Sequence, residues 1–365
     1  MNTPNEKIAP SMLSAAGLFH LILELYGAIP ARFSLAGHAL PTWYYCFELT
    51  RRCNLRCKMC QYLDWLSNTP PETQAKDELT TEEWLRVVGQ TGALSMLTFT
   101  GGEPWSRPDF SDILSYACAR RRVHFISNCV LFNEERARLC AELAPKRMGG
   151  KGLNFIGVSI DGPYEMHDFI RSQEGAFDKA AKGIAELNAR KRALGKTCPM
   201  VHLTTVIQKD NVSVLPAMPR VAKEFGADVL NLTLEIDFQG FGESGRSTLP
   251  HIQAEELQAA LEATIANAHA VGINLRLPRM PLSQIIRYYN GGVELSHFAC
   301  QALWTTIAVT RTGDVFSCLR TSVGNVRHAS LKSLRNNPKF RALRLACKKQ
   351  LPDACQGCCE LVWTP

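Results

Sequence analysis

Three cysteines, Cys53, Cys57 and Cys60, lie within the eight-residue segment CNLRCKMC. Thiolates at this spacing on one loop can hold a metal ion or an iron–sulfur cluster. Ordinary clusters and structural zinc sites use four protein ligands, so three cysteines leave one coordination position open for a substrate or cofactor. The alternatives are a zinc site completed by a distant ligand, and cysteines that bind no metal.

A second group of cysteines lies toward the C-terminus. The chain has 14 cysteines in 365 residues, which is too few for a small disulfide scaffold. The N-terminal residues MNTPNEKIAP do not resemble a signal peptide. We therefore expect a cytoplasmic protein whose clustered cysteines bind metal. The second group comprises Cys300, Cys318, Cys347, Cys355, Cys358 and Cys359.

From residue 42 to about residue 245, short β-rich runs alternate with helical patterns, which predicts βα units around a parallel sheet. Six units are fewer than the eight of a closed barrel, so we expect an α/β fold with a partial (β/α)6 TIM-like barrel. The predicted strands are Trp43–Thr50, Leu94–Thr100, Val123–Asn128, Leu153–Ile160, Met200–Ile207 and Val229–Glu235. The predicted helices are Thr80–Thr91, Phe110–Arg120, Asn133–Leu143, Ala176–Arg190 and Val212–Phe225.

Polar residues follow most of these strands where the strands end. Because the C-terminal ends of parallel strands meet at one edge of a sheet, these residues are expected to share one site. They are the three cysteines after the first strand, the Gly101–Glu103 segment after the second, then Asn128, Asp161 and Glu235.

We expect four parts in the chain. Residues 1–41 contain an amphipathic helix, Ser14–Ile29, that packs on the main domain or associates weakly with a membrane surface. Residues 42–245 form the barrel, and 246–296 form a linker region with a helix at Ile252–Ala270. Residues 297–365 form a small domain with a β-hairpin that turns at Gly313. The net charge of +7 is spread along the chain and does not indicate nucleic-acid binding.

CNLRCKMC after the first strand, TFTGGEP after the second, and the later VSIDGP and HDFIR together resemble the radical S-adenosylmethionine (SAM) superfamily. The resemblance spans about 200 residues in the family's order. It implies a [4Fe–4S] cluster on Cys53, Cys57 and Cys60 whose open iron binds SAM. Reductive cleavage of SAM would then yield a 5′-deoxyadenosyl radical that removes a hydrogen atom from the substrate.

The resemblance also suggests roles for individual residues. Gly101 and Gly102 would allow close backbone approach, and Glu103 would accept hydrogen bonds from the SAM amino group. Arg171, with Ser159, would contact the SAM carboxylate; a surface ion pair is the alternative for Arg171. Asn128 and Asp161 would bind ribose or substrate hydroxyls, and a structural turn is the alternative for Asp161. Met59 stands where the family usually has an aromatic residue, which leaves the adenine packing open.

The C-terminal cysteines resemble the SPASM/Twitch extension of this superfamily, which holds auxiliary iron–sulfur clusters. We expect one auxiliary [4Fe–4S] cluster, on Cys300, Cys318, Cys355 and Cys358. Cys347 is the substitute if one of these is wrong, and Cys359 would be cramped beside its neighbour. A zinc ribbon is the alternative.

The predicted function is a radical SAM enzyme that oxidises, or forms a bond in, a small molecule or a peptide with help from the auxiliary cluster. The alternatives are a ribosomal-peptide maturase that forms thioether or carbon–carbon crosslinks, and an iron–sulfur electron-transfer or zinc protein without SAM chemistry. Glu235 or Asp237 would take a proton from the substrate, with Asp314 a weaker candidate. Flavodoxin or ferredoxin would supply electrons.

Overall fold

The computed structural model describes residues 36–236, 250–318 and 321–364. The predicted helix Ser14–Ile29 and the candidate base Asp237 lie outside these ranges.

One sheet of ten strands dominates the fold, in the order β11-β10-β9-β1-β2-β3-β4-β5-β6-β7. The run from β1 to β7 is parallel throughout, as the partial barrel requires. The six predicted strands are confirmed, and the α/β fold class with them. These strands are β1 (Tyr44–Thr50), β2 (Met96–Gly101), β3 (Arg122–Ser127), β4 (Gly152–Ser159), β5 (Met200–Ile207) and β6 (Val229–Leu234), followed by the short β7 (Asn274–Arg276).

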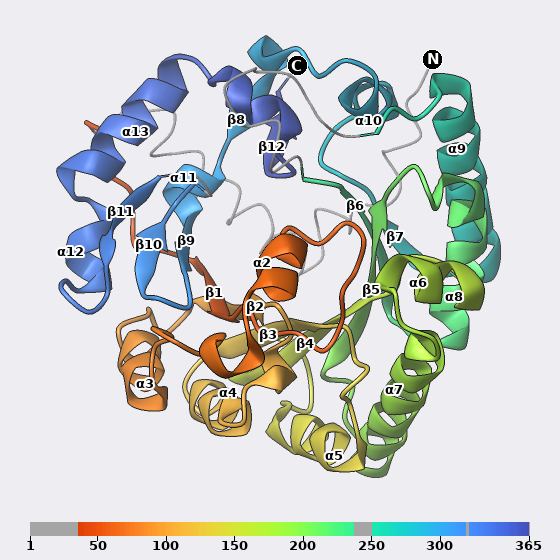
Figure 1. Cartoon of the computed structure of the whole chain (residues 1–365), viewed down its shortest axis with the longest axis horizontal. Coiled ribbons are helices and arrows are strands. Elements are labelled where there is room, and N and C mark those ends of the chain that lie inside the picture. Colours follow the sequence, from red (N-terminus) through yellow and green to blue (C-terminus); the bar gives the residue numbers. More distant parts are fainter. Residues whose placement is uncertain (1–35, 237–249, 319–320, 365) are drawn as a thin grey trace.

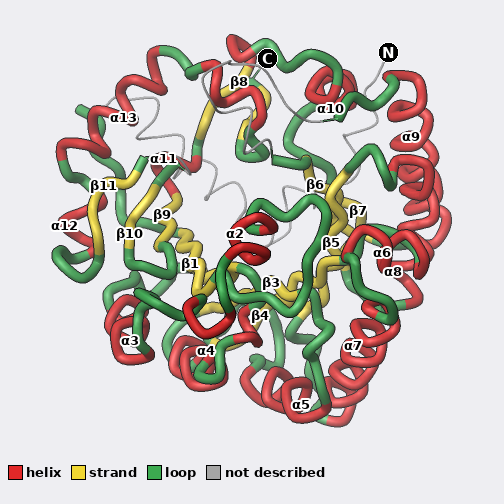
Figure 2. Tube along the Cα trace, in the orientation of Figure 1, coloured by secondary structure: helices red, strands yellow, loops and turns green. Residues whose placement is uncertain are grey.

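Helices cover the outer side of this curved sheet, and the strands form the inner arc (Figures 1 and 2). Helices α2 (Leu63–Asn68) and α6 (Tyr164–Arg171) fall in segments where we predicted none. The remaining helices of the barrel and linker are α3 (Thr81–Gly89), α4 (Phe110–Cys118), α5 (Glu134–Leu143), α7 (Ala176–Ala193), α8 (Met218–Glu224), α9 (Ala254–Val271) and α10 (Leu282–Tyr289).

Local sequence explains where several of these helices begin and end. Thr80 and Glu83 form the predicted capping box at the start of α3, and the Asn133 side chain caps α5. The helix predicted at Val212–Phe225 is instead a 3₁₀ segment, Val212–Ala217, followed by α8. Pro216 lies in that segment and lacks the amide hydrogen that a continuous α-helix needs.

An aromatic cluster joins the sheet to α3 and α4. Phe47 of β1 and Phe99 of β2 are completely buried, with ring centroids 5.9 Å apart. Trp84 lies 5.5 Å from Phe47, and Phe110 lies 6.0 Å from Phe99. Burying each such ring contributes roughly 1.5–3 kcal/mol. The helices are thereby fixed on the sheet, which holds the strand ends of the site in place.

The predicted C-terminal hairpin is present, but it extends the main sheet. Strand β9 (Thr306–Val309) pairs in parallel with β1, and β10 (Asp314–Phe316) and β11 (Ser322–Asn325) follow in antiparallel order. Gly313 forms the turn with φ of +87°, which favours glycine. The remaining C-terminal elements are β8 (Phe298–Cys300), α11 (Ala302–Thr305), α12 (Leu331–Arg335), α13 (Pro338–Lys349) and β12 (Leu361–Trp363).

The segment 76–83 connects this hairpin region to the barrel. Leu79 N–H donates to the carbonyl of Arg311 at 2.7 Å, and Arg311 donates to the carbonyl of Lys76 at 2.8 Å. Arg327 Nε pairs with Glu83 Oε1, also at 2.8 Å. The cysteine-rich C-terminal region therefore packs on the residues that precede α3 and on the first turn of α3.

In the part of the chain that the structure describes, no helix combines the length and apolar character needed to span a membrane.

Candidate active site

The three-cysteine loop leaves the C-terminal end of β1 and leads into α2. Cys57 is buried, and Cys53 and Cys60 are half-buried. A turn joins the Cys60 N–H to the Cys57 carbonyl at 3.1 Å, and Lys58 N–H donates to the carbonyl of Ile170 in α6 at 3.0 Å. The loop is therefore held both internally and by a neighbouring element.

Each of the three sulfur atoms faces a hydrogen-bond donor. Leu55 N–H lies 3.4 Å from Cys53 Sγ, and Tyr62 N–H lies 3.4 Å from Cys60 Sγ. Arg171 Nη1 lies 3.7 Å from Cys57 Sγ, and Asn128 Nδ2 lies 3.9 Å from Cys53 Sγ. Donors directed at sulfur favour the thiolate, the form that binds iron.

The donor set fits an iron–sulfur cluster. Burial raises the pKa of Cys53 to about 12, so a metal must displace the thiol proton. Within residues 36–236, 250–318 and 321–364, no three His, Cys, Asp or Glu side chains gather closely enough to hold a single metal ion. Cysteine thiolates are the usual ligands of iron–sulfur clusters, so these three cysteines would suit one.

Gly101 and Gly102 lie where the ends of β1 and β2 come closest. A Cβ on Gly101 would lie 2.1 Å from the Thr50 carbonyl oxygen, and one on Gly102 would lie 2.3 Å from that of Arg52. Gly101 also has φ of +139°. In the described structure, both glycines therefore permit a close approach between this segment and the chain that leads into Cys53.

Glu103 is completely buried between the ends of β2 and β3. Its Oε1 accepts from Ser127 Oγ at 2.9 Å and Trp105 N at 3.2 Å, and its Oε2 accepts from Asn128 N at 2.8 Å. Burial raises its pKa to about 7, although these donors oppose the shift. The carboxylate thus positions Asn128, which is itself hydrogen-bonded to Asn54 in the cysteine loop at 3.0 Å.

Asp161 and Arg171 form a buried pair beside the cysteines. Asp161 Oδ2 lies 2.6 Å from Arg171 Nη2, and Asp161 Oδ1 accepts from Val206 N at 3.0 Å. Burial lowers the pKa of Arg171, but the charge of Asp161 and the nearby Cys57 raise it by more. Arg171 Nε is buried and has no hydrogen-bond partner in the described part of the chain, which leaves a donor for a ligand carboxylate.

Three further predicted residues lie on other strands or follow them. Ser159 is half-buried at the end of β4, opposite Thr204 of β5. The Glu235 backbone is held by the hydroxyl groups of Tyr288, at 2.7 Å, and Tyr289, at 3.0 Å. Asp314, the weaker acid–base candidate, accepts hydrogen bonds from Thr312 and Asn325 within the hairpin.

The C-terminal cysteines form a second group of nearby thiols. Burial raises the pKa of Cys355 to about 12, and the thiols of Cys358, Cys300, Cys347 and Cys318 add to the shift. Burial likewise raises the pKa of Cys300 to about 12, with Cys358 and Cys318 contributing. Cys355 therefore lies within electrostatic range of the three other expected ligands and of Cys347, their expected substitute.

Comparison with known proteins places both cysteine groups in known families. Residues 47–218 match the radical SAM superfamily, and residues 300–359 match SPASM, an iron–sulfur cluster-binding domain. The chain is 30% identical over 330 residues to a PqqA peptide cyclase of Gluconobacter oxydans (strain 621H), which covers 85% of this chain and 81% of that protein. The chain belongs to the radical SAM superfamily.

Two further comparisons describe the similarity. An Fe-coproporphyrin III synthase of Methanosarcina barkeri (strain Fusaro / DSM 804) is 32% identical over 180 residues, which are 47% of this chain but only 39% of that protein. The crystal structure of Streptococcus suis SuiB bound to precursor peptide SuiA has a TM-score of 0.64 at 14% identity, covering 93% of this chain and 76% of SuiB. At this low identity, the similarity to SuiB concerns the fold alone.

Three basic side chains gather on the inner face of this radical SAM barrel. Burial lowers the pKa of His202 on β5 to about 3, and the nearby Arg276 and His124 lower it further. Phe155 lies between the two histidines, with ring centroids 6.2 Å from His124 and 4.8 Å from His202. Nε2 of each histidine is buried and lacks a partner within the described ranges, so each can bind a polar group of a ligand.

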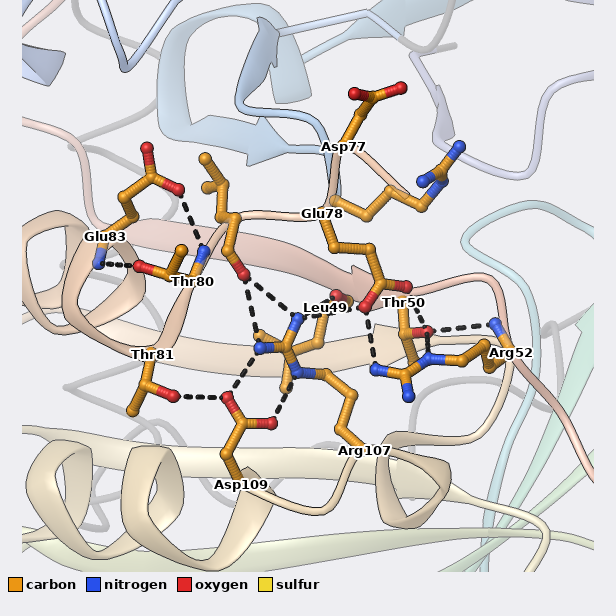
Figure 3. A network of polar contacts seen from close by, with 12 residues as sticks. Leu49, Thr50, Arg52, Asp77, Glu78, Thr80, Thr81, Glu83, Arg107 and Asp109 are labelled. Atoms are coloured by element: carbon orange, nitrogen blue, oxygen red, sulfur yellow. Dashed lines mark hydrogen bonds and ion pairs between the residues drawn. The ribbon is translucent and has the colours of Figure 1, made fainter. Parts of the chain in front are cut away.

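The sequence did not indicate a network of charged residues next to the cysteine loop of this radical SAM enzyme (Figure 3). Glu78 precedes α3 in an irregular segment, and Arg107 and Asp109 precede α4. Each residue alone is typical of a solvent-exposed loop. The Arg-Pro-Asp sequence at 107–109 is a weak signal, because an arginine two residues from an aspartate can pair with it.

Proposed function

We propose that this enzyme removes a hydrogen atom from a peptide substrate, which leads to oxidation or to a new bond within the peptide. The arrangement that carries the proposal is the trio Cys53, Cys57 and Cys60, in which each sulfur faces a donor. The bound cluster would supply the electron that cleaves SAM, and the 5′-deoxyadenosyl group would remove the hydrogen atom.

The chain's own residues have three tasks in this proposal. The cysteines would hold the cluster, and the donors facing them would stabilise the thiolates. Arg171, held by Asp161, would offer its remaining buried donor to the SAM carboxylate. Asn128 and Ser159, at the ends of neighbouring strands, would bind the ribose or substrate hydroxyls.

We assign the auxiliary cluster to Cys300, Cys318, Cys355 and Cys358, in the region that matches SPASM. Such a cluster would accept an electron from the oxidised substrate or anchor it. Glu235 or Asp237 would take the accompanying proton. A flavodoxin or ferredoxin would reduce the SAM-binding cluster.

The peptide cyclases support a peptide substrate, because one of them is 30% identical and aligns along most of both chains. A tetrapyrrole is the second candidate. The group His124, His202 and Arg276 favours it, since the Arg276 guanidinium can pair with a carboxylate and the buried Nε2 atoms of the neutral histidines can form hydrogen bonds to it. The partial match to the coproporphyrin synthase points in the same direction.

The first test is release of 5′-deoxyadenosine. Protein reconstituted anaerobically with iron and sulfide, reduced with dithionite and mixed with SAM should release it, and Cys57→Ala should not. No release by the wild type would contradict radical SAM chemistry in this chain.

The second test identifies the substrate. Peptides encoded beside the gene and a carboxylate-bearing tetrapyrrole would be incubated separately with the enzyme, and products analysed by mass spectrometry. A mass loss of two hydrogens in a peptide would support the first candidate. A mass change confined to the tetrapyrrole would show that the tetrapyrrole, and not a peptide, is the substrate.

A further inference from the structure

Four charged side chains form a network next to the cysteine loop (Figure 3). Two cations, Arg52 and Arg107, are balanced by two carboxylates, Glu78 and Asp109. The side chains of Arg107 and Glu78 are only 4% and 5% exposed. Buried charges are costly unless they are paired, so this arrangement holds its members tightly.

Glu78 binds Thr50, the last residue of β1, and Arg52, two residues further along the chain. Its Oε1 accepts from Thr50 Oγ1 at 2.5 Å, and its Oε2 accepts from Arg52 Nη2 at 2.8 Å. The same Thr50 hydroxyl accepts from Arg52 N at 2.9 Å and Nε at 3.2 Å. Since Arg52 directly precedes Cys53, the Glu78 carboxylate fixes the chain one residue before the first cysteine.

Arg107 holds Glu78 in place. Arg107 Nη1 lies 3.3 Å from Glu78 Oε2 and donates to the Leu49 carbonyl at 3.1 Å. Both Nη atoms donate to the Leu79 carbonyl at 3.2 Å. Asp109 accepts from Nε and Nη2 of Arg107, and Thr81 donates to Asp109 at 2.6 Å. Every nitrogen of this guanidinium therefore has an acceptor.

The Gly101–Glu103 backbone also binds the segment from Thr50 to Arg52. Gly102 N–H donates to the Thr50 carbonyl, and Glu103 N–H donates to the Arg52 carbonyl, each at 2.8 Å. The backbone carbonyls and the side chains of Thr50 and Arg52 are thus bound from two directions. Little freedom remains for the chain that enters Cys53.

We propose that Glu78 is a positioning residue for the SAM-binding cluster, acting through Thr50 and Arg52 on Cys53. This inference rests on the proposed function, because it requires a cluster on the cysteine loop. Metal–ligand distances tolerate only about 0.2 Å of error, so a looser Cys53 weakens the cluster. Residues that orient metal ligands typically change metal affinity by about 10–100-fold when they are replaced.

The test compares Glu78→Gln with the wild type after anaerobic reconstitution. We expect iron bound at the SAM-binding cluster to be lost to a chelator about tenfold faster. The electron paramagnetic resonance (EPR) signal of that reduced cluster, and its change on adding SAM, should also be altered, with the auxiliary signal unchanged. Glu78→Asp keeps the charge and should restore part of the wild-type behaviour.

Asp228→Asn is the matched control. Asp228 lies 3.9 Å from the buried Lys191 at the opposite, N-terminal end of the strands, so its loss should leave both cluster signals unchanged. Arg52→Gln is a second variant, whose replaced side chain is 21% exposed and whose loss the fold should tolerate. It should reproduce the Glu78→Gln effect.

Wild-type iron retention and wild-type SAM-dependent spectra in both Glu78→Gln and Arg52→Gln would overturn the proposal. If the wild type itself showed no spectral change with SAM, the proposed function would fail. Chelator-resistant iron would then still decide whether Glu78 positions the cluster, because that measurement does not require SAM.

Discussion

Arg171 Nη1 lies 3.7 Å from Cys57 Sγ, which places a permanent positive charge beside an expected cluster ligand. Asp161 holds the other end of the guanidinium at 2.6 Å, so this contact is fixed from α6. A charged donor stabilises electron density on sulfur, and the reduced cluster carries more of it. The pair is therefore expected to affect the reduction potential as well as SAM binding.

Arg171→Lys should lower the midpoint potential of the SAM-binding cluster. A lysine ammonium cannot reach both the Asp161 carboxylate and the Cys57 sulfur with the geometry of a guanidinium. The shift should be on the order of 59 mV, a tenfold change for a one-electron couple, in an EPR-monitored redox titration. Arg190→Lys, on the exposed pair with Glu134, serves as control. Equal potentials in all three proteins would contradict a role for Arg171 at the sulfur.

Gly102→Ala should disturb the cluster while leaving most of the fold intact. Its Cβ would meet the Arg52 carbonyl at 2.3 Å and push the chain before Cys53 away. We expect reduced iron content and loss of the SAM-dependent spectral change, with an unchanged far-ultraviolet circular dichroism spectrum. Gly89→Ala in α3 has only a 3.8 Å contact, to the Tyr116 hydroxyl, and should behave as wild type. A Gly102→Ala protein with full iron content would show that the close contact between Gly102 and the Arg52 carbonyl is not essential for cluster binding.

The auxiliary ligands can be assigned by iron counting. Cys355→Ala should reduce iron from about eight to about four atoms per chain, the loss of one [4Fe–4S] cluster. Cys359→Ala should retain the full count. Burial raises the pKa of Cys359, followed by the charge of Glu360, and its neighbour Cys358 is the cysteine that adds to the shift. The same measurement on Cys347→Ala and Cys318→Ala separates the two candidates. Iron loss in Cys347→Ala but not in Cys318→Ala would exchange them in the ligand set.

Stability should fall in acid because of buried histidines. The folded-state pKa of His202 is lowered to about 3 by burial and nearby basic groups, below about 6.5 in an unfolded chain. Below pH 6.5 the unfolded chain therefore binds a proton that the folded protein does not. The contribution of His202 to the free energy of unfolding is therefore present above pH 6.5. It is lost as the pH falls toward 3, by up to about 1.4 kcal/mol per pH unit.

Urea denaturation followed by tryptophan fluorescence between pH 7 and 5 tests this expectation. His202→Gln should show a shallower decline with falling pH than the wild type. His269→Gln, at an exposed position on α9, is the control and should decline like the wild type. Identical slopes in all three proteins would show that His202 does not contribute.

Sequence patterns predicted the parts of the site that depend on local spacing. The six strands, the capping box at Thr80 and the loop that follows β1 are all read from periodicity or from adjacent residues. They also brought Cys53, Glu103, Asn128 and Asp161 to one edge of the sheet, because parallel strands end together. Arg171 was predicted to contact SAM, and its contacts with Asp161 and Cys57 depend on how α6 packs.

The network around Glu78 could not be predicted in this way. Its members are separated by up to 57 residues in sequence, and burial alone distinguishes them from ordinary loop charges. The parallel pairing of β9 with β1 was missed for a similar reason. A hairpin motif specifies its own turn at Gly313 but not which strand of another region it joins.

The stretch from Lys76 to Glu83 faces both ways, toward Arg311 and Arg327 on one side and toward Thr50 and Arg52 on the other. Detaching the cysteine-rich C-terminal region would remove the contacts that support the segment from which Glu78 binds Thr50 and Arg52. Heating or limited proteolysis should thus release iron from the SAM-binding cluster and the auxiliary cluster in a single step.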